Sequence, residues 1–327
     1  MRTLRRLRLP AVVAATLMAI LSSAAPVAAA EVASLVNLQF PNDPESIAID
    51  HHGNIFVSAP LANKVLEIRR GSTHATTFAT LPANVLGIRL DEEGHLFAAV
   101  LGAGIFELPE DMAAPAKVAS PPPGSPEFFW NGMAFDRHGN LYVSESHFGE
   151  IWRLSEDGTF TKWLSGSALV GTVLPGPCGL VHPAVAAGFG AIGANGLFFN
   201  KSGDLFVNNT DLGTILRIRV NRDGSAGAAS VIAGPSCDLW GADGGAFDNR
   251  DNLYIAANSG NKIIKLEPNG HFALFSNSDL LHFPTDIAFG FAGDRKVAYI
   301  TNLALTSGFA DGGIVTLEVG TPGRNLP

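Results

Sequence analysis

The sequence has little charge, little cysteine and few of the familiar catalytic motifs. Asp, Glu, Lys and Arg make up only 16% of its 327 residues, and the formal net charge at pH 7 is −8. A shortage of basic residues argues against nucleic acid or an anionic membrane as a partner. The sequence also lacks a serine-hydrolase elbow, a glycine loop for phosphates and the Cys/His spacing typical of zinc sites. These absences exclude several large enzyme classes.

The basic residues gather at the N-terminus. Four arginines lie among the first eight residues, an apolar run follows from Leu9 to about Leu21, and Ala28 to Ala30 precede Glu31. This order predicts a signal peptide over residues 1–30 and an exported, extracellular protein. Because the leader holds four of the 22 basic residues and no acid, the mature chain has a net charge of −12. The alternative is a membrane anchor, but a spanning helix needs about 20 apolar residues, and no other stretch is long enough.

The rest of the chain contains an internal repeat. Each copy approximates X-Gly-φ-x-φ-Asp-x-x-Gly-Asn-φ-φ-φ, where φ is apolar, and most copies continue with a third and a fourth alternating run. The runs on both sides of the Asp-x-x-Gly turn are typical of paired strands. Successive copies start 41, 45, 64, 48 and 42 residues apart. The copies are ESIAIDHHGNIFVSA from Glu45, LGIRLDEEGHLFAAV from Leu86, NGMAFDRHGNLYVSE from Asn131, NGLFFNKSGDLFVNN from Asn195, DGGAFDNRDNLYIAA from Asp243 and TDIAFGFAGDRKVAYIT from Thr285.

Four antiparallel strands repeated at this interval are typical of the blades of a β-propeller. The six copies therefore predict an all-β, six-bladed β-propeller that forms one domain over residues 31–327. The last copy stops after its third strand, while the segment from Ser34 to Phe40 is a predicted strand ahead of the first copy. We expect this N-terminal strand to complete the last blade and close the ring.

A long insertion separates the third and fourth copies. Residues 165–194 are rich in Gly, Ala and Pro and join an outer strand to the next inner strand, on the face where the inner strands begin. They are interpreted as a lid over that face, with a solvated insertion as the alternative. Cys178 lies in this insertion and Cys237 in the equivalent connection one blade later. Their shared face favours a disulfide in an oxidising compartment over two free buried thiols.

The first residue of each copy is expected at one mouth of the central channel, because the first strand of a blade lines the axis. Four of these positions carry carboxylates or carboxamides, which in the same register would converge. Asn or Asp before Gly is also a common turn signal, which is the alternative. Two carboxylates brought together would repel unless a cation separated them. Hard cations such as Ca²⁺, Mg²⁺ or Mn²⁺ prefer such oxygens. The predicted metal ligands are Glu45, Asn131, Asn195 and Asp243, and Leu86 and Thr285 hold the other two positions.

Over nearly all of the mature chain, the sequence resembles the senescence marker protein/gluconolactonase family, whose relatives include diisopropylfluorophosphatases and paraoxonases. In that family a Glu opens blade one, an Asn opens blades three and four, and an Asp opens blade five, in the order of the four ligands just named. The sequence departs from the family at Ser46 and Ile47, where Gly-Pro is usual, and at Trp130, where Pro is usual. These departures affect the prediction of the substrate more than the prediction of the metal site.

The resemblance implies a Ca²⁺-dependent hydrolase of a lactone or related ester, in which the metal stabilises an oxyanion at the channel mouth. It also implies that Asp243 is the general base. A carboxylate bound to a dication is a weak base, so a histidine is the alternative. His147 is the preferred histidine, because it lies in the same blade as Asn131.

Several residues are expected to contact a small-molecule substrate. Trp130 and Trp240 lie beside two of the predicted ligands in the sequence, which suggests an apolar pocket next to the metal, unless these rings pack between blades. The remaining candidates on the same face are His182 in the insertion, and Asn209 and Asn258 at the ends of second strands.

Two other functions remain open. A non-catalytic, secreted binding propeller of the NHL type could use the metal only for structure, although such propellers lack the Glu/Asn/Asn/Asp set. Whatever its function, the protein is expected to be a monomer. A Mg²⁺-dependent lyase of the streptogramin-inactivating kind is also a propeller, but its repeats more often carry Trp-Phe-Thr-Glu at the second strand, which this sequence lacks.

Overall fold

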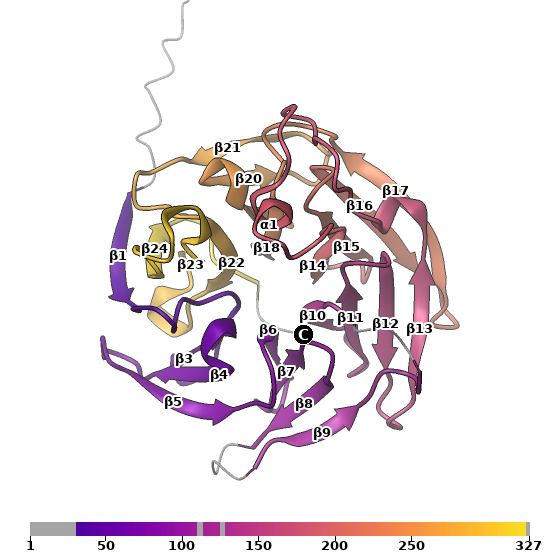
Figure 1. Cartoon of the computed structure of the whole chain (residues 1–327), viewed down its shortest axis with the longest axis horizontal. Coiled ribbons are helices and arrows are strands. Elements are labelled where there is room, and N and C mark those ends of the chain that lie inside the picture. Colours follow the sequence, from indigo (N-terminus) through magenta and orange to yellow (C-terminus); the bar gives the residue numbers. More distant parts are fainter. Residues whose placement is uncertain (1–30, 110–113, 125–127, 325–327) are drawn as a thin grey trace, which may run out of the picture.

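A computed structural model describes residues 31–109, 114–124 and 128–324, and the predicted signal peptide lies outside the described residues. In this part of the chain the strands form six four-stranded antiparallel sheets around a central axis (Figure 1). The predicted six-bladed β-propeller is therefore confirmed. Within the same ranges, no helix is long and apolar enough to cross a membrane.

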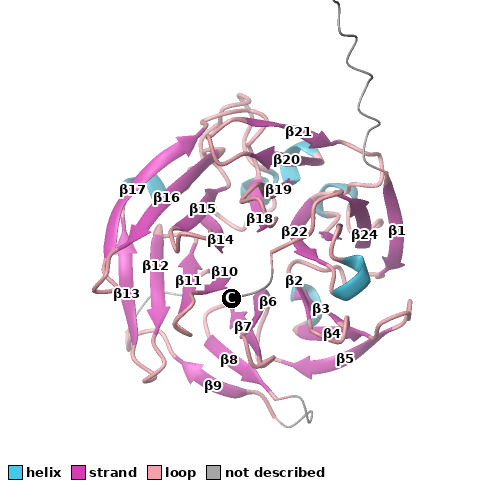
Figure 2. Cartoon of the chain, turned by 180° about the vertical axis from the view of Figure 1, so that it is seen from behind, coloured by secondary structure: helices cyan, strands magenta, loops and turns pink. Residues whose placement is uncertain are grey.

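Five blades take their four strands in sequence order, from the channel to the rim (Figure 2). The first two are β2 to β5 (Ile47–Ile49, Ile55–Ala59, Lys64–Ile68, Ala75–Thr80) and β6 to β9 (Val85–Leu90, Leu96–Val100, Gly104–Leu108, Ala116–Ala119). The other three are β10 to β13 (Trp130–Phe135, Leu141–Glu145, Glu150–Leu154, Phe160–Ser165), β14 to β17 (Ala194–Phe199, Leu205–Asn209, Thr214–Val220, Ala226–Ala233) and β18 to β21 (Ala242–Phe247, Leu253–Ala257, Lys262–Leu266, Phe272–Ser276). Helical structure is limited to α1 (Pro183–Ala186) and 3₁₀ turns at Pro60–Ala62, Ser167–Leu169, Asn258–Gly260, Ala292–Asp294 and Leu305–Ser307 in the described ranges.

The sixth blade joins the two ends of the chain. It consists of β22 (Pro284–Phe289), β23 (Val297–Asn302) and β24 (Gly313–Glu318), with β1 (Val32–Asn37) as its outer strand. The strand β1 pairs antiparallel with β24, so that Val32 lies opposite Leu317 and Asn37 opposite Gly313. The prediction that an N-terminal strand closes the ring is confirmed, and each sheet therefore has a neighbour on both sides.

The repeated Asp-x-x-Gly turn sets the register of the inner hairpins. In the first blade, Asp50 Oδ1 accepts hydrogen bonds from the backbone N–H groups of His52 and Asn54, both at 2.8 Å. Gly53 has a φ of +86°, which glycine adopts without strain. A short turn held in this way fixes which residues of the first and second strands lie opposite each other.

The glycine after the first residue of most copies allows the inner strands to approach closely. A Cβ atom on Gly87 would collide with the carbonyl oxygen of Asn131, and one on Gly132 would collide with that of Asn195. The same holds for Gly196 and Gly244 against the next blades. Because these glycines bring the inner strands together, the side chains just before them converge on the channel axis.

Candidate active site

The first residues of all six copies line one cavity at the mouth of the channel. This cavity has a volume of about 100 Å³. It lies at the ends where the inner strands begin, under the insertion. The six residues that the sequence places in this ring are Glu45, Leu86, Asn131, Asn195, Asp243 and Thr285, and all of them line the cavity.

The two carboxamides of this ring are held in the same way. Asn131 Nδ2 donates to Ser146 Oγ at 3.2 Å, and Asn195 Nδ2 donates to Thr210 Oγ1 at 3.0 Å. Each hydroxyl donates in turn to a backbone carbonyl of the next blade, at 2.7 and 2.8 Å. Because the amide nitrogens are engaged, the carbonyl oxygen of each side chain is left to face a cation.

The carboxylate of Glu45 lacks a partner. Its side chain is buried, and Oε2 has no hydrogen-bond donor in the part of the chain that the structure describes. Burial raises the pKa of Glu45 well above its ordinary value, and the negative charges of Asp243 and Asp286 raise it further, against the opposing effect of Arg89. An unpartnered buried carboxylate is costly, and a cation within reach of its oxygens removes that cost.

A chain of hydrogen bonds holds Asp243 from the side of the insertion. Asn258 Nδ2 donates to Asp243 Oδ2 at 2.9 Å, and the partner of Asn258 Oδ1 is His182 Nε2 at 3.0 Å. The backbone N–H of Ala184 donates to His182 Nδ1 at 3.2 Å, which places the imidazole proton on Nε2. Burial lowers the pKa of His182 to about 4, so this histidine is neutral at physiological pH.

The hydrogen bond from Asn258 also affects the pKa of Asp243. Burial raises the pKa of Asp243 well above its ordinary value, and the negative charge of Asp286 adds to the shift. Hydrogen bonds from Asn258 and Asn195 lower it. Together the ring offers two carboxylates and two amide oxygens with no sulfur or imidazole, a donor set that suits a hard divalent cation such as Ca²⁺.

Another acidic group lies outside this cavity. Asp91, Glu93 and His95 come within reach of a common ion at the turn between β6 and β7, at the far end of the inner strands. Two of them are solvent-exposed, and His95 Nδ1 lies 3.0 Å from Asp91 Oδ2. Since Asp91 and His95 already pair with each other in a turn, we assign the candidate metal centre to the channel ring.

The opposite half of the cavity is apolar. Over the sixth, first and second blades most of its wall is hydrocarbon, apart from Glu45, Asn84 and Thr285, and the repeat pattern did not point to these apolar residues. Pro60 and Leu101 follow the first residue of their copy by the same interval that separates Asn195 from Thr210, so this register could have revealed these two. The apolar lining comprises Pro60, Leu61, Leu101, Phe283, Leu303, Leu305 and Phe309, with Phe129 and Phe189 beside the carboxamides.

The insertion forms a cap over the cavity and is fastened to the blades. His182, Ala184, Phe189 and Ile192 from this segment line the cavity, and α1 lies near the centre of the ring in Figure 1. Asp211 Oδ2 accepts backbone hydrogen bonds from Thr172 at 3.0 Å and from Ile192 at 2.7 Å. Both ends of the cap are therefore held by one carboxylate.

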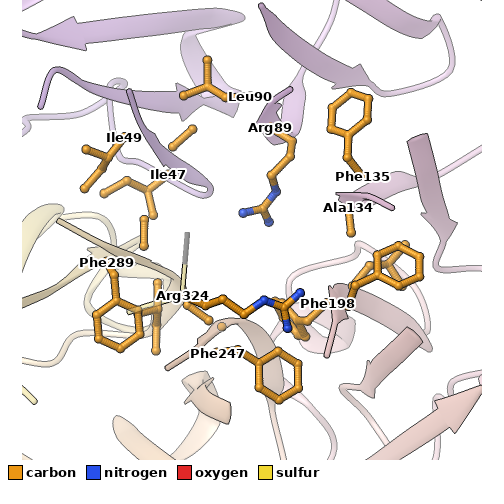
Figure 3. A pocket seen from close by; sticks show the side chains of 17 residues that line it. Ile47, Ile49, Arg89, Leu90, Ala134, Phe135, Phe198, Phe247, Phe289 and Arg324 are labelled. Carbon is orange, nitrogen blue, oxygen red and sulfur yellow. The ribbon is translucent and has the colours of Figure 1, made fainter. Parts of the chain in front are cut away.

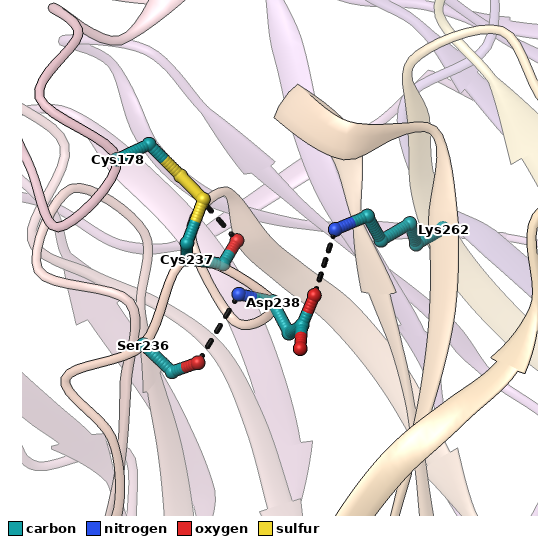
Figure 4. The surroundings of a disulfide bond; sticks show 5 residues. All are labelled: Cys178, Ser236, Cys237, Asp238 and Lys262. Carbon is teal, nitrogen blue, oxygen red and sulfur yellow. Dashed lines mark hydrogen bonds and ion pairs between the residues drawn. A yellow bond between two sulfur atoms is a disulfide. The ribbon is translucent and has the colours of Figure 1, made fainter.

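The predicted disulfide is present. Cys178 in the cap and Cys237 in the next blade are bonded, with their Cα atoms 4.9 Å apart (Figure 4). Beside the bond, Asp238 accepts from Lys262 Nζ at 2.9 Å, which ties the connection to the fifth blade. The cap is thus covalently linked to its neighbour.

Trp130 lies outside the cavity. Its ring is fully buried and stacks on Phe128, with 4.7 Å between the ring centroids, and meets Trp152 edge-on at 5.8 Å. Successive side chains of a strand point to opposite faces, so Trp130 points into the core because Asn131 points into the channel. The alternative that this tryptophan packs between blades is the arrangement that the structure shows.

Two other residues that were predicted to contact the substrate contact the cap instead. Asn209 Nδ2 donates to the carbonyl oxygens of Ala168 and Val170, both at 3.0 Å, so its amide fastens the start of the insertion. Trp240 is buried behind the cavity and meets the ring of His182 edge-on at 5.6 Å. Asn209 and Trp240 therefore support the cavity wall without lining it, whereas Asn258 and His182 line it.

His147 lies behind the aromatic wall. Its Nε2 atom is 2.9 Å from the carbonyl oxygen of Phe189, and its ring lies 4.6 Å from that of Phe129. Phe129 and Phe189 line the cavity and His147 does not. In this arrangement the imidazole has no direct path to a substrate on the ring.

A narrow space continues below the ring. Here Ser46 and Asp286 occupy the positions that hold glycine in the other four blades, and Ser46 Oγ donates to Asp286 Oδ2 at 2.7 Å. Burial raises the pKa of Asp286, and the positive charge of Arg89 opposes this. The departure from Gly at Ser46 thus builds a hydrogen bond across the junction of the first and last blades.

Known proteins share this fold. No model of a protein family matches the sequence, and no curated protein matches it. Among solved structures, a calcium-binding regucalcin from Agrobacterium tumefaciens has 17% identity and a TM-score of 0.68 and covers 90% of this chain and 97% of its own. A gluconolactonase from Xanthomonas campestris has 16% identity and a TM-score of 0.65, with 90% of each chain covered. A virginiamycin B lyase from Staphylococcus aureus, at 16% identity, covers 84% of this chain and 82% of its own with a TM-score of 0.59.

At these identities the likeness concerns the fold. The gluconolactonase and regucalcin structures superpose more closely than the lyase. The chain has the six-bladed propeller fold of the gluconolactonase and regucalcin structures, the group that its sequence resembles.

Proposed function

We propose that the chain is an exported, Ca²⁺-dependent hydrolase of a lactone or related ester with an apolar substituent. The observation that carries this proposal is the cavity itself. It combines a ring of four oxygen-bearing side chains, one of them an unpartnered buried carboxylate, with a hydrocarbon wall. A regucalcin described as calcium-binding and a gluconolactonase share the fold.

The ring residues would hold the cation. Glu45 and Asp243 would contribute carboxylates, and Asn131 and Asn195 the amide oxygens that their hydroxyl partners leave free. When bound at such a site, Ca²⁺ polarises the substrate carbonyl and stabilises the negative charge that develops on its oxygen. Mg²⁺ or Mn²⁺ would suit the same ligands.

Asp243 is the best placed general base. Both nitrogens of His182 are occupied, Nδ1 by the N–H of Ala184 and Nε2 by Asn258, so this imidazole cannot accept a proton without breaking a bond. His147 lies outside the cavity lining. Asp243 lines the cavity, and its Oδ2 atom is positioned by Asn258. The carboxylate would take a proton from an attacking water.

The apolar wall sets the substrate class. A sugar lactone carries hydroxyl groups, which would lose hydrogen bonds to water against Phe283, Leu303 and Leu305. An alkyl or aryl substituent would instead gain by leaving water. We therefore expect an alkyl lactone or an aryl ester. Export by the predicted leader, action as a monomer and a small-molecule substrate complete the proposal.

The test is a panel of alkyl lactones, sugar lactones and aryl esters with the mature protein, with and without a chelator. We expect hydrolysis of the apolar members that stops on chelation and returns with Ca²⁺. Asp243→Asn should abolish turnover and weaken Ca²⁺ binding about 100-fold or more, because it removes a charged ligand. The control is Asp238→Asn, which changes an exposed carboxylate of the same type. Tight Ca²⁺ binding without turnover on any member would favour a binding propeller with a structural metal.

A further inference from the structure

A second cavity opens at the opposite mouth of the channel, where the inner strands end. It has a volume of about 120 Å³. Figure 3 shows it from close by, with two arginines among hydrocarbon side chains. Its wall includes Ile47, Phe135, Phe198, Phe247 and Phe289. This cavity has no part in the function proposed above.

Arg89 enters the cavity from β6. Its Nε donates to the carbonyl oxygen of Met133 at 2.9 Å, which fixes the guanidinium plane. The same side chain borders the narrow space below the metal ring, together with Phe198. Arg89 therefore stands between the two ends of the channel, with its outer nitrogens toward the lower cavity (Figure 3).

Arg324 enters from the C-terminal segment, which crosses this mouth. Its backbone N–H donates to the carbonyl oxygen of Phe247 at 3.0 Å, and its guanidinium lies 5.9 Å from the centre of the Phe247 ring. Nη1 is 3.7 Å from Asp251 Oδ1, which is too far for a hydrogen bond. Nη1 is buried, and within the described ranges it has no acceptor.

The nearby acids compensate this pair only in part: Asp251 lies 3.7 Å from Arg324 Nη1, and the charge of Arg89 acts on Asp286. At the rim, Asp50 accepts from backbone N–H groups in its own turn and Asp91 pairs with His95, while Glu92 is exposed. Deeper in the channel, Asp286 accepts from Ser46 and from three backbone N–H groups. Burial lowers the pKa of Arg324, and the negative charge of Asp251 opposes this shift.

We propose that this lower cavity binds a small organic carboxylate, with Arg89 and Arg324 on the carboxylate group and the phenylalanine rings around its apolar part. A guanidinium fork matches the two oxygens of a carboxylate. The volume admits one molecule about the size of benzoate. Inorganic phosphate has no hydrocarbon to cover the rings and would leave charged oxygens against them.

The test is titration of benzoate into the mature, calcium-loaded protein, followed by calorimetry. We expect saturable binding at one site per chain. Arg324→Gln should weaken it roughly tenfold or more, because a hydrogen bond to a charged group is lost. Arg89→Lys should weaken it similarly through loss of the fork. The control is Arg69→Gln, which changes an exposed arginine on the first blade.

Three results would overturn the proposal. The first is unchanged benzoate affinity in Arg324→Gln, a variant at the chain end that leaves every blade intact. The second is phosphate binding as tight as benzoate binding, which would make the site a general anion site. The third is benzoate binding that occurs only after residues 325–327 are removed, since the cavity would then serve the end of the chain itself. None of these results bears on hydrolysis at the upper cavity.

Discussion

Replacement of His182 by Phe tests whether the cap positions the proposed metal ligands. Phe keeps the aromatic contacts with Trp240 and Phe283 but removes the bond to Asn258 Oδ1. Ser259 Oγ also donates to that oxygen, at 3.1 Å, so the oxygen keeps a partner. Phe also removes the acceptor of the Ala184 N–H, which affects the start of α1. The loss that reaches Asp243 is that of the bond to Asn258, one neutral hydrogen bond of about 1 kcal/mol.

We expect this loss to appear at the cation. Without His182 the Asn258 amide can rotate and stop donating to Asp243, so a preorganised ligand becomes mobile. A change of about 1 kcal/mol lowers Ca²⁺ affinity roughly fivefold. Calorimetric Ca²⁺ titration measures it, and His271→Phe, which replaces an exposed histidine in a turn, is the control.

A double-mutant cycle makes the test stricter. If His182 acts through Asn258, then His182→Phe should have little further effect in an Asn258→Leu background. Equal effects of His182→Phe in both backgrounds, or wild-type Ca²⁺ affinity in a folded His182→Phe variant, would refute the relay.

Two further predictions concern stability. Asp43 is fully buried, and neither of its carboxylate oxygens has a hydrogen-bond partner in the described residues. Burial raises the pKa of Asp43 from 3.8 to about 6. The folded state therefore holds a proton that the unfolded state loses, and the stability of the protein falls as the pH rises from about 3.8 to 6. Asp43→Asn should therefore stabilise the protein by about 3 kcal/mol at pH 8 and not at pH 4, measured by denaturant unfolding; an equal gain at both pH values would contradict this. The Cys178→Ser, Cys237→Ser double variant should lose about 4 kcal/mol, since the bond spans a 59-residue separation. Its Ca²⁺ affinity should persist because Asp211 still holds the cap, and lost Ca²⁺ binding would assign the disulfide a role in the site.

The sequence predicted the architecture because the fold is a repeat. The Asp-x-x-Gly turn and the glycine after each first residue recur for local reasons, a tight turn and a close approach of strands. Six copies therefore sufficed to give the number of blades, and a count of strands sufficed for the closure by β1. Because the copies align residue by residue, the sequence also predicted that their first residues form a ring at the channel mouth.

The walls of the cavity were harder to predict. Trp130 illustrates the difficulty, because proximity to Asn131 in sequence suggested a shared site, while strand alternation turns the two side chains apart. The contacts of His182 arise from the path of an irregular insertion, which no period describes. Arg89 and Arg324 lie more than 200 residues apart in sequence, and only the closed ring brings them to one cavity.

The closure of the ring also dictates an order of events during synthesis. Among the described strands β1 is made first, yet its pairing partner, β24, is the last to be made. The strand β1 therefore stays unpaired until β24 has been made. The ring of blades can close only at that late stage of synthesis. Contacts between such distant segments form slowly. Because β1 completes the sixth blade, removal of residues 31–36 should leave five intact blades and a sixth with an open edge.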